Sequence, residues 1–124
     1  MNGDVETGRA LYIVRTWMPE EQLDEWYRWH SQEHMPDVAA QPGVIRATKY
    51  RVIEDNMPAE WAAQYATVYE FESLAAFETY RAGAEAARLR ADHADRYGAA
   101  GKIARQVLVA EVDLPGSVSA SSND

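Results

Sequence analysis

Cysteine is absent from this chain of 124 residues, so neither disulfide bonds nor thiol chemistry contributes to its stability or its function. Positive charge is scarce as well: 12 Lys and Arg stand against 20 Asp and Glu, which gives a formal net charge of −8. A surface of that charge repels polyanions at long range. The composition therefore argues against a protein that binds nucleic acid.

Long apolar runs are also missing, since no stretch approaches the roughly 20 apolar residues that a membrane-spanning helix needs. Residues 1–6 are polar and acidic and lack the basic and apolar regions of a signal peptide. Motifs for binding phosphates or dinucleotides are absent, as is the G-x-S-x-G nucleophile motif. With 47% hydrophobic residues, the chain can form one packed core, and we predict a cytoplasmic domain without a cofactor.

The pattern of apolar residues predicts strands and helices in the order β-α-β-β-α-β. β-branched and aromatic residues favour the strands, and apolar spacings of three and four favour the helices. Ser73 is expected to cap the second helix, Gly83 to break it, and Pro36 to break or kink the first helix near Met35. Strands are predicted at residues 11–18, 44–53, 65–72 and 104–114, and helices at residues 19–40 and 74–97.

This order is typical of a ferredoxin-like α+β fold, a four-stranded antiparallel sheet with two helices on one face. Apolar residues occur on both faces of the first strand, including Leu11 and Ile13 on one face and Tyr12 and Val14 on the other. The helices cover only one of these faces. A bare apolar face predicts that two copies pair into a homodimer.

The chain is expected to hold one domain, at residues 9–114. Residues 1–8 are predicted to be a flexible lead-in. The serine-rich tail at residues 115–124 is predicted to be disordered, because it is polar and terminal.

Two of the three histidines, His30 and His34, lie four residues apart in the aromatic stretch that ends the first helix. On a helix this spacing places both imidazoles on one face, which also carries Trp26. Histidine titrates near neutral pH, so His34, assisted by His30, is a candidate general acid or base. The nearby carboxylate of Asp37 is a candidate to orient the His34 ring. The alternative is a histidine that fills the kink before Pro36.

The same segment matches the inverted zinc-protease pattern H-x-x-E-H, in which two histidines hold zinc and a glutamate activates water. Such proteases need a third protein ligand and a larger domain, so we predict no metal. The third histidine, His93, stands among charged residues and is predicted to lie on a solvated helix face. A metal or haem site on His30 and His34 remains an alternative.

Tyrosines on the predicted strands supply hydroxyl groups that can donate to a developing oxyanion or hold a phenolic substrate. We predict Tyr69 as the catalytic tyrosine. Packing in the core is the alternative for each tyrosine and tryptophan. Arg15 and Arg46, in mid-strand, are candidates to hold a carboxylate, although a salt bridge between subunits is the favoured interpretation. The predicted substrate contacts are Tyr12, Trp26, Tyr50, Tyr65 and Asp37.

Short motifs resemble the EthD-like group of the dimeric α/β-barrel superfamily. They are the His34-Met35-Pro36-Asp37 run, the Pro42-Gly43-Val44 entry to a strand, Tyr50-Arg51 near its end, and Tyr69-Glu70-Phe71 leading into Ser73-Leu74. The resemblance implies a four-stranded sheet that pairs with a second copy. It also implies a ligand cleft between each sheet and its own helices, faced by a histidine of the first helix, here His34.

The resemblance implies a small cofactor-independent enzyme that moves a proton on an apolar, oxygen-bearing molecule, such as a lactone, enone, β-keto acid or polyketide-like phenol. Isomerisation, cyclisation and decarboxylation all suit a histidine with a tyrosine. Two alternatives stay open: a cofactor-free monooxygenase of the same fold, and a binding or accessory protein without turnover. One fold hosts many functions, so the residues of the site must decide.

Overall fold

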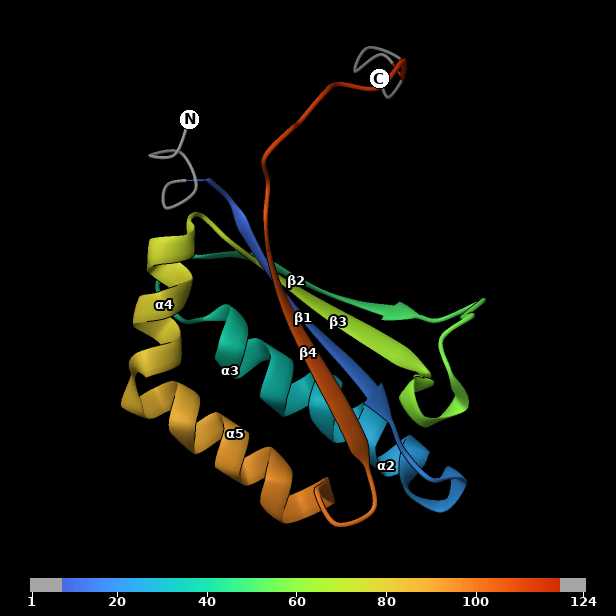
Figure 1. The fold of residues 1–124 in the computed structure, drawn as a ribbon. Coiled ribbons are helices and arrows are strands. Elements are labelled where there is room, and N and C mark those ends of the chain that lie inside the picture. Colours follow the sequence, from blue (N-terminus) through green and yellow to red (C-terminus); the bar gives the residue numbers. More distant parts are fainter. Residues whose placement is uncertain (1–7, 119–124) are drawn as a thin grey trace.

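The computed structural model, which describes residues 8–118, consists of a four-stranded antiparallel sheet with its long helices on one side (Figure 1). The strand order is β2-β3-β1-β4, which confirms the predicted ferredoxin-like fold. The elements are β1 (Ala10–Trp17), α2 (Glu20–Trp29), the π-helix η1 (His30–His34), α3 (Met35–Ala39), β2 (Val44–Arg51), the 3-10 helix η2 (Ala59–Trp61), β3 (Tyr65–Phe71), α4 (Leu74–Ala82), α5 (Ala84–Tyr97) and β4 (Lys102–Val109).

The first helix continues through the position where a break or kink was predicted, by widening into the π-turn η1. The Met35 N–H donates to the carbonyl oxygen of His30, five residues back. Pro36 has no N–H and cannot donate to the carbonyl of Gln32, so an α-helical ladder is interrupted at this point. The wider turn keeps the segment continuous and holds His30 and His34 on its inner side.

The two signals predicted for the second helix are confirmed. The Ser73 hydroxyl accepts a hydrogen bond of 3.0 Å from the Ala76 N–H at the start of α4. Gly83, in extended geometry, separates α4 from α5. This break lets the two helices follow different directions across the sheet (Figure 1).

The prediction for the last strand was wrong at its C-terminal end. β4 pairs with β1 up to Val109, which lies opposite Ala10, the first residue of β1. Past Val109 one more backbone hydrogen bond follows, from the Ala110 N–H to the Arg9 carbonyl oxygen at 3.1 Å, and the chain then leaves the sheet as an extended segment (Figure 1). The remainder of the predicted tail, at residues 119–124, and most of the predicted lead-in, at residues 1–7, fall outside the described residues.

The core lies between the sheet and the helices, in two apolar clusters. One is centred on aromatic residues of β3 and α4, with Val38 and Leu89 from the neighbouring helices. The other lies under α2, where Trp26 is fully buried against Met18, Trp29 and Tyr97. Burying large aromatic side chains provides much of the stability of a small domain. The histidines lie close to the second cluster.

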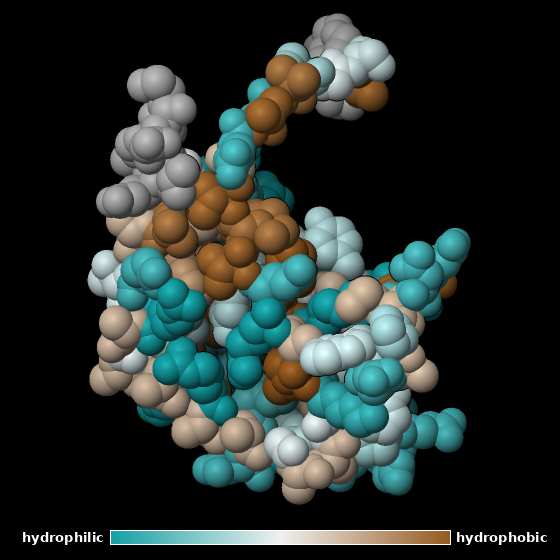
Figure 2. Space-filling model, viewed as in Figure 1, coloured by the Kyte–Doolittle hydropathy of each residue, from teal (hydrophilic) through white to brown (hydrophobic). Residues whose placement is uncertain are grey.

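Each helix of the described part is too short or too polar to span a bilayer. The face of the sheet that the helices leave bare carries Leu11, Val68 and Leu108, which line an open groove of about 530 Å³. Apolar side chains also gather beside the end of β4 and continue along the segment that leaves it (Figure 2). Both observations agree with the expected bare apolar face.

Candidate functional site

A small chamber lies between the sheet, the π-turn and α5, and all three histidines of the chain line it. Its volume is about 30 Å³, which exceeds the roughly 10–15 Å³ that a cavity needs to hold one water molecule. Besides η1, six other secondary-structure elements contribute side chains to its wall: β1, α3, β3, α4, α5 and β4. The lining residues are Tyr12, Val14, His30, His34, Val38, Tyr69, Tyr80, His93, Ile103 and Arg105.

The π-turn stacks two of the histidines on each other. The ring centroids of His30 and His34 are 5.3 Å apart and their planes differ by 23°. The ring of His93, from α5, stands edge-on to both, at 6.3 Å from His30 and 5.6 Å from His34. The predicted pairing of His30 and His34 on one inward face is therefore what the structure shows.

His30 is the most enclosed of the three, with 3% of its surface exposed. Its ring stacks on Trp26 at 4.5 Å. Burial lowers the pKa of His30 to about 2, and the positive charge of Lys49 and the neighbouring histidines lower it further in the same direction. His30 is thus a neutral imidazole at neutral pH.

The prediction that His93 lies on a solvated face was wrong, because its side chain is 6% exposed and belongs to the chamber. The indole N–H of Trp26 donates to His93 Nε2 at 3.0 Å. Burial lowers the pKa of His93 to about 4, so this ring is also neutral. The sequence held a signal for its burial, since Ala86, Leu89, His93 and Tyr97 follow the spacing of one helix face and are all buried.

His34 is half-buried and lines both the chamber and an outer groove. Burial lowers its pKa, while the carboxylates of Asp92 and Asp37 act in the opposite direction. It is the histidine that contacts both the chamber and the outer groove, and the two carboxylates partly offset the effect of burial on its pKa. These are the properties expected of a group that exchanges protons with a ligand.

Three tyrosines complete the chamber. Tyr69 is almost fully buried, and its hydroxyl has no hydrogen-bond partner within residues 8–118. Burial raises the pKa of Tyr69 far above its usual value and that of Tyr80 to about 12, so both retain their protons. The Tyr12 hydroxyl accepts a hydrogen bond of 3.0 Å from Arg105 Nε. Tyr80 and Arg105 were not among the predicted site residues.

The other predicted substrate contacts lie outside the chamber. Trp26 stands behind His30, and Tyr65 packs against Trp26 at 5.8 Å. Asp37 faces the outer groove, and Tyr50 is 55% exposed on the opposite face of the sheet.

The two mid-strand arginines lie away from the chamber as well. Arg15 forms an ion pair with Asp55 of the same chain. Arg46 lines the groove on the bare sheet face.

Lys49 of β2 is a half-buried cation that the sequence reasoning missed. Its Nζ donates to Ser31 Oγ at 2.6 Å and lies 3.9 Å from the ring centroid of Tyr27 and 4.7 Å from that of Trp26. Burial lowers the pKa of Lys49 to about 8. The aromatic rings hold this charge beside His30, where it opposes protonation of the imidazole.

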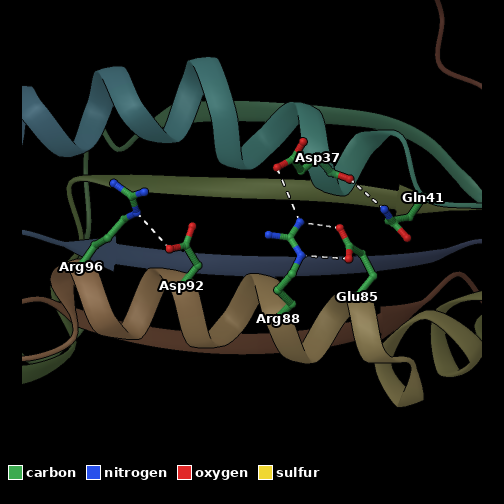
Figure 3. Close-up of polar contacts among 6 residues, drawn as sticks. All are labelled: Asp37, Gln41, Glu85, Arg88, Asp92 and Arg96. Carbon is green, nitrogen blue, oxygen red and sulfur yellow. Dashed lines mark hydrogen bonds and ion pairs between the residues drawn. The ribbon is translucent and has the colours of Figure 1, made fainter.

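The outer groove, of about 520 Å³, runs between α3 and α5 and shares His34 with the chamber. Figure 3 shows its charged lining, in which Arg88 of α5 reaches Asp37 of α3 at 3.9 Å and also pairs with Glu85. About two turns further along α5, Arg96 pairs with Asp92 at 3.0 Å. The two acids whose charge reaches His34 are therefore each paired with an arginine.

The chamber was also compared with the requirements of a metal site. Within residues 8–118, no three His, Asp or Glu side chains are grouped so that they could hold a metal ion. The stacked rings of His30 and His34 give a reason, since nearly parallel imidazoles do not direct their nitrogens at one point.

Comparison with known proteins assigns the chain to a family but not to an activity. A family model described as a domain of unknown function, DUF4286, matches residues 9–110. No curated protein matches the sequence.

Solved structures share the fold at low sequence identity. An EthD family protein from Bacillus halodurans has a TM-score of 0.62 at 10% identity, over 84% of this chain and 99% of its own. A mutant of SnoaB, a cofactor-independent oxygenase from Streptomyces nogalater, has a TM-score of 0.64 at 17% identity, and the match covers 88% of this chain and 99% of SnoaB. The hydroxynitrile lyase of Passiflora edulis has a TM-score of 0.60 at 13% identity, and the match covers 88% of this chain and 99% of the lyase. The resemblance to the EthD-like group is thereby confirmed for the fold.

Proposed function

This chain belongs to the DUF4286 family, and we propose that it is a small cofactor-independent enzyme that transfers a proton on an oxygen-bearing small molecule. One observation carries the proposal: histidines and tyrosines of five elements line a single chamber next to an open groove. A cofactor-independent oxygenase and a hydroxynitrile lyase with the same fold support a small-molecule enzyme.

In the proposed mechanism, neutral His34 takes a proton from the carbon next to a substrate carbonyl. The negative charge moves to the carbonyl oxygen, which receives a hydrogen bond from Tyr69. His34 then returns the proton to another carbon, which isomerises the substrate. In a β-keto acid, loss of carbon dioxide itself leaves the electron pair of the broken bond as the enolate, and His34 in its protonated form then delivers one proton to that carbon. His30 supports the His34 ring by stacking and does not itself take up the proton, because its pKa is too low.

The volumes define how a substrate fits. The chamber has room for a small polar group of the substrate, while the outer groove of about 520 Å³ accommodates the body of a small molecule. His34 lies between the two spaces. Binding a larger group inside the chamber would require movement of rim side chains, of which Arg105 is exposed.

Replacing His34 with Gln is expected to lower turnover by about 10²-fold or more, because the amide keeps the polar contacts but cannot carry a proton. Turnover is measured by absorbance and mass spectrometry on a panel of lactones, enones, β-keto acids and phenols. Tyr50→Phe, on the opposite sheet face, is the matched control and should retain full activity. Binding of panel compounds without any turnover would instead support the binding-protein alternative.

The fold shared with SnoaB favours one alternative, a cofactor-free oxygenase. Such a reaction consumes O2, whereas isomerisation and decarboxylation do not. An oxygen electrode therefore separates the two on any panel compound that is converted.

We also propose that a second copy of this chain covers the bare sheet face. Support comes from the apolar groove lined by Leu11, Val68 and Leu108 and from the half-exposed Leu108 side chain. Leu108→Arg is expected to halve the mass measured by light scattering, because a buried unpaired charge opposes the interface. The control is Ile53→Arg, at an 81% exposed site in the loop after β2. A wild-type monomer at micromolar concentration would contradict the proposal.

A further inference from the structure

We propose that the chamber recognises a carboxylate group, so that the substrate is an organic acid bound by His93, Tyr12 and Arg105. This inference rests on the proposed function, because it assigns a substrate class to the same chamber. It follows from the direction of two hydrogen bonds, which leaves one free donor on His93 and one on Tyr12.

The first bond fixes the proton of His93. Because the Trp26 indole N–H donates to His93 Nε2, that nitrogen is the acceptor and the proton of the neutral ring sits on Nδ1. The Nδ1 atom is buried and has no hydrogen-bond partner in the described part of the chain. His93 therefore presents a buried N–H donor that a ligand oxygen would satisfy. The low pKa of His93 is in accord with a neutral ring.

The second bond fixes the direction of Tyr12. Its hydroxyl oxygen accepts from Arg105 Nε, so the hydroxyl proton is available to donate elsewhere. Arg105 keeps its remaining N–H groups, and no carboxylate of residues 8–118 forms a salt bridge with it. A guanidinium binds a carboxylate with two parallel hydrogen bonds.

The charges around the chamber point the same way. With the histidines neutral, Arg105 is the one formally charged side chain among the described residues that line it. The nearest acids of the groove, Asp37 and Asp92, are engaged by Arg88 and Arg96 (Figure 3). The chamber lining therefore offers an anion one cationic partner, Arg105, even though the whole chain carries a net charge of −8.

The test is a titration of the full chain with sodium acetate and, separately, acetamide at constant ionic strength, followed by 1H–15N spectra of the imidazole groups. Before ligand is added, His93 should be protonated at Nδ1, and Trp26→Phe should abolish that preference. Acetate should then shift the His93 signal saturably, and acetamide should bind about 10-fold more weakly or worse, because a charge-assisted bond is worth roughly 1.5–3 kcal/mol.

Four variants make the result specific. Arg105→Gln and His93→Leu should each weaken acetate binding by about 10-fold or more, since each removes a donor. His93→Asn should bind within about threefold of wild type, because its amide nitrogen lies near the Nδ1 position. Arg46→Gln, on the bare sheet face, should be unchanged.

Equal binding of acetate and acetamide, unchanged binding by Arg105→Gln, or absence of a saturable shift at His93 would each overturn the inference. The outcome is separable from that of the proposed function. Acetate binding with these features but no turnover of any panel compound would refute the enzyme and leave the carboxylate site standing. Turnover that depends on His34 but is not inhibited by acetate would refute the carboxylate site and leave the proposed enzyme standing.

Discussion

Lowering the pH from about 7 to about 5 is expected to reduce the free energy of unfolding by about 3–4 kcal/mol, through His30 and His93 together. In the folded protein their pKa values are about 2 and about 4, whereas in the unfolded chain both are near 6.5. At a pH between the folded and unfolded pKa values, these histidines are protonated in the unfolded chain and neutral in the folded protein. Stability is therefore complete above about pH 7 and is lost progressively as the pH falls.

Urea unfolding at a series of pH values measures this loss. The window above pH 5 isolates the histidines, because most carboxylates remain ionised in both states there. His93→Phe, which keeps an aromatic ring but cannot titrate, should flatten the pH dependence by about half. A free energy of unfolding that stays constant between pH 7 and pH 5 would show that the two imidazoles are not buried as neutral groups.

Replacing Trp26 with Ala is expected to lower the free energy of unfolding by about 3–5 kcal/mol. The side chain is fully buried, stacks on His30, packs on Tyr65 and donates to His93, so its removal leaves a cavity and an unpaired acceptor. For a domain of this size the melting temperature should fall by on the order of 10 °C or more.

The matched control is Trp61→Ala, since Trp61 is 52% exposed at the end of η2. Surface substitutions of this kind usually change stability by less than about 0.5 kcal/mol. Both variants are compared with wild type by urea unfolding and by thermal melting. If Trp26→Ala and Trp61→Ala lost similar stability, Trp26 would not anchor the histidine cluster.

Features that depend on neighbouring residues were predictable from the sequence. The order of the elements, the Ser73 cap and the break at Gly83 follow from local propensity. The pairing of His30 with His34 follows from helical spacing alone, and Pro36 marked the irregular turn without revealing its π form. Alternation along the strands indicated that both sheet faces are apolar.

Features that join distant parts of the chain were not predictable. The Trp26–His93 bond spans 67 positions, and the Arg105–Tyr12 bond spans 93. Periodicity indicates that a residue points inward, as it did for His93, but it does not identify the element that it meets. Tyr50 was misjudged for a related reason, since alternation separates two faces without saying which one the helices cover.

The sequence by itself thus determined the fold, the helix that carries two histidines and the acidic, cysteine-free character of the chain, because these depend on composition and on short-range geometry. Only the tertiary structure decided which side chains share the chamber, which imidazoles stay neutral and which groups act as donors. Desolvation and hydrogen-bond direction are properties of the packed assembly of α2, η1, α5 and the sheet, and no single segment of the chain contains them.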